Sequence, residues 1–177
     1  MIFMDKIISL DYFLTNLFNK SIPHNIFFDY FFSFFSMKGG SILIWMAIIV
    51  LLIIFEEKIN KKFILKYFLV ALVITSIVVF GLKNTVKRAR PTTVCEKDFS
   101  FPSGHAATAF AAATVLTFFD KKRRWFYYLV AVLIGYSRIY LGCHYFLDVI
   151  TGALVGYIIS QTLLFVPGTF PFRRKSW

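Results

Sequence analysis

The chain has 177 residues, of which 58% are hydrophobic and 20% aromatic, and its mean hydropathy is +0.69. A soluble domain of this length rarely has so apolar a composition, so we expect an integral membrane protein. The net charge of +11 does not indicate a nucleic-acid-binding protein, because ten of the 20 Lys and Arg residues lie in segments 56–62, 120–124 and 167–177, beside apolar runs. Basic residues in such places are typical of the cytoplasmic connections of membrane proteins.

The first 38 residues predict two short helices that lie at the membrane surface. Apolar residues recur at helical spacing around the polar residues Asp11 and Thr15, and this pattern is typical of an interfacial helix. The next apolar segment, 25–36, is short and carries Asp29. A sixth membrane crossing formed by these two segments remains an alternative. Because Asp5 and Asp11 interrupt the first apolar run, we expect no cleavable signal peptide.

Five longer apolar segments follow, and a membrane crossing takes about 20 residues. They are 39–55, 63–82, 106–119, 125–142 and 149–166. We therefore predict an all-α fold, a polytopic membrane helix bundle of five to six transmembrane helices with the N-terminal interfacial helices added. The corresponding division of the chain is an N-terminal region, 1–38, and a transmembrane domain, 39–177.

Two features inside these segments have structural interpretations. Gly152 and Gly156 form a GxxxG pattern, which predicts close helix packing in this domain or between subunits. The aromatic residues Trp45, Trp125 and Tyr127 are expected to contact lipid or to anchor helices at the membrane interface.

The connections between the five segments fall into two groups, because each crossing changes the side of the membrane. The connections after the first and third segments and the C-terminal end share one side, and they hold the basic runs EEKINKK, DKKRR and RRK. We predict that this side is cytoplasmic. The connections after the second and fourth segments share the other side, where residues 83–105 and the end of 137–148 lie. The chemically unusual residues are therefore all expected on one face, away from the cytoplasm.

The second segment ends in a basic cluster, Lys83 and Arg90 followed by Pro91. Seven positions separate the two cations, about two helical turns, so both can point in the same direction. Lys87 and Arg88 lie between them. A basic segment beside a membrane commonly binds lipid headgroups. This one faces outward, against the usual charge distribution, and so we interpret it as a candidate anion site.

The third segment begins with the sequence FPSGH, residues 101–105. Ser103 is a candidate helix N-cap, which would place His105 in the first turn. The free N–H groups and the dipole of a helix N-terminus attract anions. A simple turn accounts for Ser103 and Gly104 but not for a histidine at the membrane rim.

The stretch 137–148 carries Arg138, His144 and Asp148. His144 and Asp148 are four residues apart, so they share one face if a single helix continues through them. The carboxylate can then hold one N–H of the ring and prepare the other nitrogen to attack. Arg138 offers a planar fork that suits phosphate oxygens. For this stretch alone, a structural His–Asp hydrogen bond beside a snorkelling arginine is the alternative.

Together the three clusters favour an anion over a metal. Histidine and aspartate also bind metals, but Lys83, Arg90 and Arg138 would repel a divalent cation and attract an anion with several oxygens. We therefore expect no metal and no cofactor. Phosphate fits best, and the membrane setting indicates that the phosphate belongs to a lipid.

These residues resemble a known family. Lys83, Arg90 and Pro91, then Pro102 to His105, then Ser137, Arg138, His144 and Asp148 are similar in order and spacing to the complete three-part signature of the type 2 phosphatidic acid phosphatases, the PAP2 superfamily. The resemblance implies a helical membrane fold and metal-independent hydrolysis of phosphate esters. By matching position it makes His144 the nucleophile that forms a phosphohistidine, Asp148 the residue that orients it, and His105 the acid that protonates the leaving oxygen. It assigns phosphate binding to Lys83, Arg90, Ser103, the Gly104 backbone and Arg138.

The expected activity is that of an integral membrane lipid phosphatase, which removes the terminal phosphate of a lipid phosphomonoester or diphosphate. Undecaprenyl diphosphate, lipid A 1-phosphate, phosphatidylglycerol phosphate and phosphatidate are the candidate substrates. The expected setting is the bacterial cytoplasmic membrane, with the site on the periplasmic face, the bilayer and the lipid as partners, and no nucleic acid. Phosphate transfer to another lipid and non-catalytic transport or binding remain alternatives. The oligomeric state and the pairing of Cys95 with Cys143 are left open.

Overall fold

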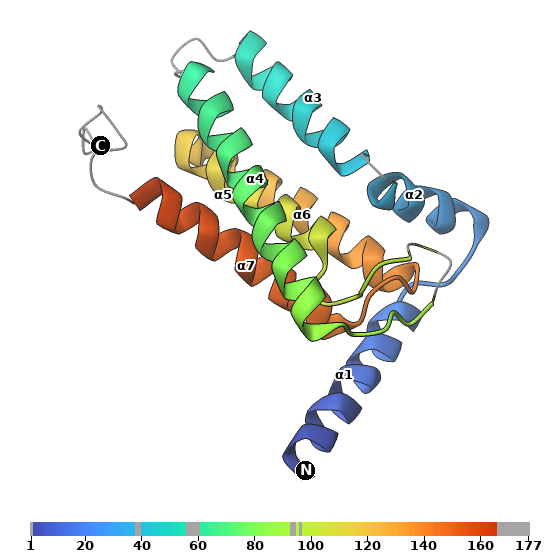
Figure 1. Ribbon diagram of the computed structural model, residues 1–177. Helices are drawn as coiled ribbons and strands as arrows, with labels where there is room; N and C mark the ends of the chain where they lie inside the picture. Colours follow the sequence, from blue (N-terminus) through green and yellow to red (C-terminus); the bar gives the residue numbers. More distant parts are fainter. Residues whose placement is uncertain (1, 38–39, 56–60, 93–94, 96, 166–177) are drawn as a thin grey trace.

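The computed structural model describes residues 2–37, 40–55, 61–92, 95 and 97–165, and this part of the chain is helical, without a strand. The helices are α1 (Ile2–Lys20), α2 (Ile26–Ser36), α3 (Gly40–Phe55), α4 (Lys61–Val86), α5 (Gly104–Phe119), α6 (Arg124–Tyr140) and α7 (Phe146–Phe165), with a 3-10 turn at Lys121–Arg123 (Figure 1). The predicted all-α fold is confirmed, and the five long apolar segments correspond closely to α3 through α7. By length and composition α4 and α7 can each cross a membrane, while the other apolar helices are shorter, so the number of crossings stays a prediction.

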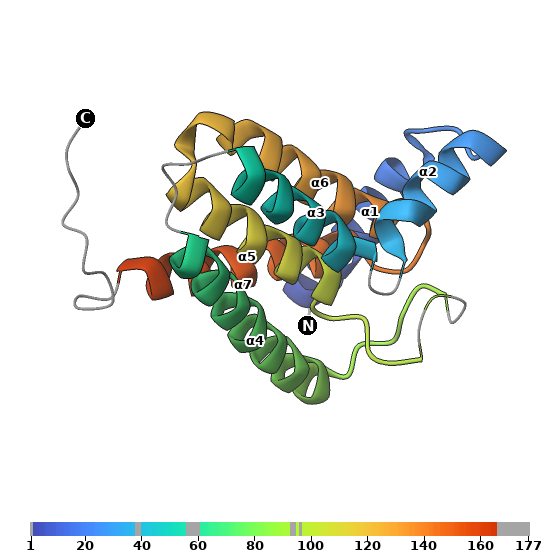
Figure 2. The ribbon, with the colours of Figure 1, turned by 90° about the horizontal axis from the view of Figure 1, so that it is seen from above.

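The centre of the bundle is α5, which packs against α4, α6 and α7 (Figure 2). Its inner surface is built from small side chains that are completely buried, including Ala106, Ala107, Ala109 and Ala113. The exposed apolar side chains belong to the surrounding helices, among them Val73 and Ile77 of α4, Val132 of α6, and Leu154 and Ile158 of α7. The segment predicted as the third crossing is therefore a core helix, and its neighbours present the surface that suits lipid.

Close packing of α7 on α5 depends on the two glycines of α7. A Cβ atom on Gly152 would lie 2.4 Å from the carbonyl oxygen of Ser103, and one on Gly156 would lie 1.9 Å from that of Ala107. Both distances are shorter than a non-bonded contact allows, so only glycine fits. The close packing predicted from the GxxxG pattern is confirmed, and it occurs within the chain.

The expectation for the aromatic residues is wrong at two of three positions. Trp45 is 2% exposed and Tyr127 is 0% exposed, so both belong to the core, whereas Trp125 is 76% exposed. The Tyr127 hydroxyl donates to the buried Asp120 carboxylate at 2.6 Å, and Asp120 also accepts from Arg123. This polar contact gives the tyrosine an internal partner and removes its need for the interface.

The N-terminal helices pack on the bundle, α1 against α6 and α7 and α2 against α6. Apolar side chains such as Phe13 and Leu17 of α1 are exposed, which agrees with an interfacial helix. In an interfacial helix Asp11 and Thr15 would face water, but here they are 1% and 8% exposed. The polar side of α1 therefore faces the protein. The division of the chain at residue 38 remains a prediction.

Two separate ends of the bundle emerge from this arrangement. The ends of α4 and α6 and the starts of α5 and α7 gather at one end, next to α1 (Figure 1). Hydrogen bonds from Ser100 N–H to the Arg88 carbonyl at 2.8 Å and from Ser103 N–H to the Asp148 carbonyl at 2.9 Å join them. The predicted clusters therefore share an end of the molecule. Of the basic connections predicted at the opposite end, residues 56–60 and 167–177 lie outside the described residues.

Gly156→Ala tests the packing of α7 on α5. The added methyl group meets the Ala107 carbonyl, so we expect overpacking to reduce the free energy of unfolding by about 1–3 kcal/mol or more. The measurement is thermal unfolding of the purified protein in detergent. Gly81→Ala is the matched control, because nothing lies within 4 Å of a Cβ atom at this position of α4. The control is expected to be neutral or slightly stabilising, and equal melting temperatures for both variants would contradict the packing argument.

Candidate active site

The site is organised around Asp148, which is 0% exposed in the first turn of α7. One carboxylate oxygen, Oδ2, accepts the N–H of Tyr145 at 2.9 Å, so the carboxylate caps the helix that carries it. The other oxygen, Oδ1, accepts from Nη1 of Arg88 at 2.7 Å. Oδ2 also lies 3.6 Å from Nδ1 of His144. Two fixed hydrogen bonds thus set the plane of the carboxylate behind the imidazole ring.

His144 lies in the turn between α6 and α7 and not on a helix. The helix does not continue from His144 to Asp148, as a single-face pairing would require, because α6 ends at Tyr140 and α7 begins at Phe146. The turn has Gly142 at φ +69°, and the Arg138 carbonyl accepts the N–H groups of Cys143 at 2.9 Å and His144 at 3.1 Å. The turn, and not a continuous helix, therefore places the His144 side chain next to Asp148.

The proton of the His144 ring can be assigned from its partners. Nη1 of Arg90 lies 3.0 Å from Nε2, and because a guanidinium can only donate, Nε2 is the acceptor and Nδ1 carries the hydrogen. The Nδ1–Oδ2 separation of 3.6 Å is too long for a hydrogen bond. Burial, together with the positive charges of Arg90 and Arg138, outweighs the nearby Asp148 and lowers the pKa of His144 to about 4. The ring is neutral at physiological pH.

The predicted phosphate-binding cations Lys83 and Arg90 share a carboxylate from the protein itself. Asp98 accepts from Nζ of Lys83 at 2.8 Å and from Nη2 of Arg90 at 2.5 Å. Burial raises the pKa of Asp98, but the hydrogen bonds and charges of the two cations outweigh it and hold this pKa at about 2. Asp98 was not identified from the sequence, where it is one of several charged residues in a polar loop.

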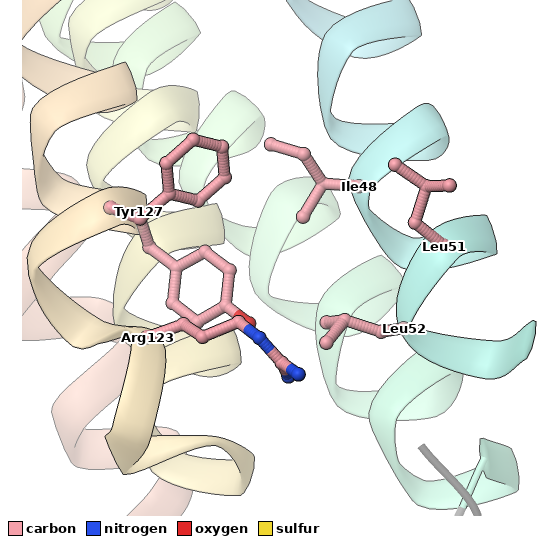
Figure 3. Close-up of a pocket in the computed structure, with 6 residues that line it drawn as sticks. Ile48, Leu51, Leu52, Arg123 and Tyr127 are labelled. Atoms are coloured by element: carbon pink, nitrogen blue, oxygen red, sulfur yellow. The ribbon is translucent and has the colours of Figure 1, made fainter. Parts of the chain in front are cut away.

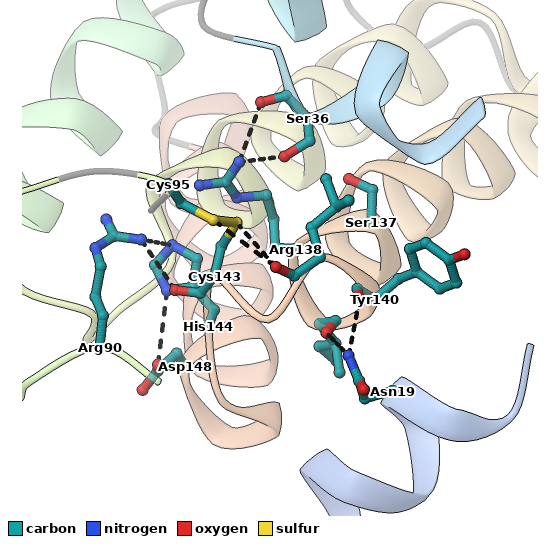
Figure 4. The surroundings of a disulfide bond; sticks show 12 residues. Asn19, Ser36, Arg90, Cys95, Ser137, Arg138, Tyr140, Cys143, His144 and Asp148 are labelled. Carbon is teal, nitrogen blue, oxygen red and sulfur yellow. Dashed lines mark hydrogen bonds and ion pairs between the residues drawn. A yellow bond between two sulfur atoms is a disulfide. The ribbon is translucent and has the colours of Figure 1, made fainter. Parts of the chain in front are cut away.

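Arg138, the third predicted phosphate ligand, is 2% exposed. Its Nη1 donates to the carbonyl of Ser36 at 3.0 Å and to the Ser36 hydroxyl, at the end of α2 (Figure 4). The guanidinium therefore connects the His144 turn with the N-terminal helices. Ser36 is a second residue that sequence reasoning missed.

The N-terminus of α5 adjoins the first turn of α7. Ser103 is the N-cap, as predicted, and its hydroxyl accepts the N–H of Ala106 at 3.4 Å. The N–H of Ser103 donates to the Asp148 carbonyl at 2.9 Å, which places the first turn of α5, with Gly104 and the half-buried His105, beside the turn that holds Asp148. The structure thus collects the predicted residues at one end of the bundle.

A disulfide links two parts of the site. Cys95 and Cys143 are bonded, with their Cα atoms 5.6 Å apart (Figure 4). The bond attaches the loop that carries Arg90 and Asp98 to the residue that precedes His144. The pairing that the sequence left open is therefore present.

The described residues provide no metal site, and His144 is buried among them. No three His, Cys, Asp or Glu side chains among them are placed to hold an ion. His144 is 1% exposed, with Arg90 at its Nε2. A cavity of about 300 Å³ lies elsewhere, between α3 and the start of α6, and is lined by none of the predicted catalytic or phosphate-binding residues (Figure 3). It is lined by Ile48, Leu51, Leu52, Arg123, Phe126 and Tyr127.

Comparison with known proteins agrees with this geometry. The model of the PAP2 superfamily matches residues 64–170, which include all three clusters. An undecaprenyl-diphosphatase from Sulfolobus acidocaldarius is 32% identical over 148 residues, covering 79% of this chain and 71% of that protein. The crystal structure of LpxE from Aquifex aeolicus has a TM-score of 0.70 at 34% identity, covering 88% of this chain and 94% of that one.

A more distant structure shows the fold alone. A transmembrane PAP2-type phosphatidylglycerolphosphate phosphatase from Bacillus subtilis has a TM-score of 0.68 at 20% identity, covering 95% of this chain and 90% of that one. The family match, the relatives and the shared fold lead to one conclusion. The chain belongs to the PAP2 superfamily, whose membrane phosphatases hydrolyse phosphate esters.

Proposed function

We propose that the chain hydrolyses the terminal phosphate of a lipid phosphomonoester or diphosphate through a phosphohistidine on His144. The observation that carries this proposal is the state of the His144 ring. Its Nε2 faces a cation at 3.0 Å, while a buried carboxylate lies 3.6 Å behind Nδ1. A neutral ring with its lone pair toward the cations and its proton toward a carboxylate is prepared to attack phosphorus.

On this proposal the substrate phosphate replaces Asp98 on Lys83 and Arg90. The Asp98 side chain is 51% exposed, whereas that of Arg90 is 2% exposed, so the carboxylate is the outer group of the cluster. A terminal phosphate carries up to two negative charges and three acceptor oxygens, and it competes with Asp98 for both cations. As Nη1 of Arg90 turns to the phosphate, the lone pair of Nε2 becomes free.

The chemical steps then follow. Nε2 attacks phosphorus, the bond from phosphorus to the lipid oxygen breaks, and His105 gives that oxygen a proton. Asp148 stabilises the positive charge that the ring acquires. Water next attacks phosphorus, His105 accepts a proton from it, the bond from phosphorus to nitrogen breaks, and inorganic phosphate leaves. The cations, with Ser103 and the Gly104 N–H, stabilise the charge on the phosphoryl oxygens.

Two observations support the choice of substrate and location. A relative that covers 79% of this chain is named an undecaprenyl-diphosphatase, which makes undecaprenyl diphosphate the first lipid to test. The disulfide between Cys95 and Cys143 lies beside His144, and disulfides persist in oxidising compartments. We therefore propose that this end of the bundle faces outward from the cytoplasmic membrane.

Phosphate release by the purified protein in detergent, with EDTA present, tests the reaction. We expect release from at least one of undecaprenyl diphosphate, lipid A, phosphatidylglycerol phosphate and phosphatidate, and we expect His144→Ala to reduce it to background. His105→Ala is expected to reduce the rate of phosphate release from the lipid by about 10²–10⁴-fold, which is the usual contribution of a general acid. The same variant should show a far smaller reduction in rate on p-nitrophenyl phosphate, because the leaving oxygen of this substrate needs no proton.

The third histidine of the chain provides the matched control. His24 is exposed and stacks on Tyr140 at 4.3 Å, so His24→Ala is expected to keep wild-type activity. No release from any of the four lipids by folded wild type would contradict phosphatase activity. Release abolished by EDTA would contradict the metal-free mechanism.

The pH dependence of kcat/KM tests the state of His144. The attacking form is the neutral ring, and the pKa of His144 is lowered to about 4. After correction for ionisation of the substrate, we therefore expect kcat/KM to persist as the pH falls through 6.5 and to decline only near pH 4. Asp98, with a pKa of about 2, stays ionised over this range. A decline centred near 6.5 would show that the neutral form of His144 is not favoured.

Cysteine labelling in intact cells tests the orientation. After reduction, we expect a membrane-impermeant maleimide to label Cys95, because Cys143 is 1% exposed. The control is Lys122→Cys in a Cys95→Ser/Cys143→Ser background, because Lys122 is exposed in the connection between α5 and α6, at the opposite end. This cysteine should react only after the cells are permeabilised. The reverse labelling pattern would place the site on the cytoplasmic face.

A further inference from the structure

Arg88 connects Asp148 to a second buried carboxylate, that of Asp11 in α1. Its Nη1 donates to Asp148 at 2.7 Å and its Nη2 to Asp11 at 2.5 Å. The guanidinium carbon lies 3.9 Å from the centre of the Tyr145 ring. Asp11 and Asp148 are 1% and 0% exposed. The fork of one arginine therefore fixes two carboxylates from distant parts of the chain.

Side chains of α1 also cap the start of α7. The second oxygen of Asp11 accepts the N–H of Leu147 at 2.8 Å, and the hydroxyl of Thr15 accepts the N–H of Phe146 at 2.9 Å. These are donors that a helix leaves without a partner in its first turn. The position of α1 is thus coupled to the helical turn that carries Asp148.

The charges of this group do not cancel. Arg88 contributes one positive charge against the two negative charges of Asp11 and Asp148, so the group has a net charge of −1. It lies on the Nδ1 side of His144, whereas Arg90 lies on the Nε2 side. When the ring becomes positive, its charge and that of the group cancel. Without Asp11, Arg88 would neutralise Asp148 before the reaction begins.

We propose that Asp11 and Arg88 are positioning residues for this reaction, which hold Asp148 in place and keep one net negative charge behind the His144 ring. The proposal rests on the proposed role of His144 as the nucleophile. Neither residue is a position of the family signature, although Arg88 lies between Lys83 and Arg90 in the first cluster. The N-terminal helix α1 is then part of the reaction machinery and not only a membrane anchor.

The other charged or titratable groups near His144 differ from this pair in what they contact. Among the residues that the structure describes, those that act on His144 are Arg90 from the loop after α4, Arg138 from α6 and Asp148 from α7. Arg90 and Arg138 carry charge toward the phosphate, and His105 is the proposed acid. Asp11 and Arg88 act on the ring through Asp148, so changing them should alter kcat more than KM.

The test compares Asp11→Asn with the charge-balanced double variant Asp11→Asn/Arg88→Gln. Loss of the Asp11 charge is expected to reduce kcat about tenfold or more, while KM for the lipid stays within about threefold. Removing Arg88 as well restores the net charge of −1 through Asp148 alone. We therefore expect kcat of the double variant to recover above that of Asp11→Asn, although below wild type.

Matched variants separate charge from folding. Asp5→Asn removes an exposed carboxylate from the same helix, and it should keep wild-type kcat. Arg88→Lys keeps the charge and loses the fork, so its kcat should fall less than that of Asp11→Asn. Detergent size-exclusion chromatography and thermal unfolding establish whether each variant is folded. Values of kcat are compared among folded variants only. Where Asp11→Asn does not fold, kcat is measured for Arg88→Lys and Thr15→Val instead.

The outcomes are distinct. Wild-type kcat in folded Asp11→Asn, or a double variant no more active than Asp11→Asn, would overturn the charge role. Where Asp11→Asn does not fold, a wild-type kcat for Arg88→Lys would overturn the positioning role. Failure of the proposed function looks different, because wild type would then release no phosphate or His144→Ala would retain activity.

Discussion

The complete burial of the Asp148 carboxylate is the constraint on which the rest of the site depends. An unpaired charge in such a place costs several kcal/mol, so every element that supplies a partner must come to it. Arg88 arrives from the loop after α4, and the Tyr145 N–H from the turn before α7. The backbone carbonyl of Asp148 accepts the N–H of Ser103 at the start of α5. Contacts to the side chain and backbone of this one residue therefore assemble the loops that carry the proposed nucleophile, acid and cations.

That assembly is possible only because α5 and α7 are in backbone contact. The hydrogen bond from Ser103 to Asp148 forms at the end of an interface where Gly152 and Gly156 leave no room for a Cβ atom. The small alanine side chains of α5 also allow α4 and α6 to pack closely against it. Larger side chains in the interface between α5 and α7 would separate the N-terminal ends of these two helices, and His105 would move away from the His144 turn. The small residues of the core thus act on the chemistry through helix spacing.

Local sequence patterns predicted the helices and most of the proposed site, whereas contacts between residues far apart in the sequence could not be predicted. Ser103 as an N-cap depends on the next few residues, and the spacing of His144 and Asp148 is short, so the sequence displays both. Asp11 meets Arg88 across 77 positions and Ser36 meets Arg138 across 102, and no local pattern marks such pairs. Trp45 and Tyr127 were misplaced for another reason. In a membrane protein both faces of a helix are apolar, so hydrophobic periodicity does not tell the core side from the lipid side.

The internal partners of the cations bear on how a lipid phosphatase can work in a membrane full of phosphate groups. Ordinary phospholipids are phosphodiesters with one negative charge on phosphorus, and they vastly outnumber any substrate. Lys83 and Arg90 are already bound to Asp98, and Nη1 of Arg90 covers Nε2 of His144. On the proposed mechanism, an anion must displace a carboxylate of pKa about 2 to uncover the nucleophile. A terminal phosphate has a second negative charge and a third free oxygen with which to compete, whereas a diester has neither. On that mechanism, competition with Asp98 favours terminal phosphates over the surrounding lipid.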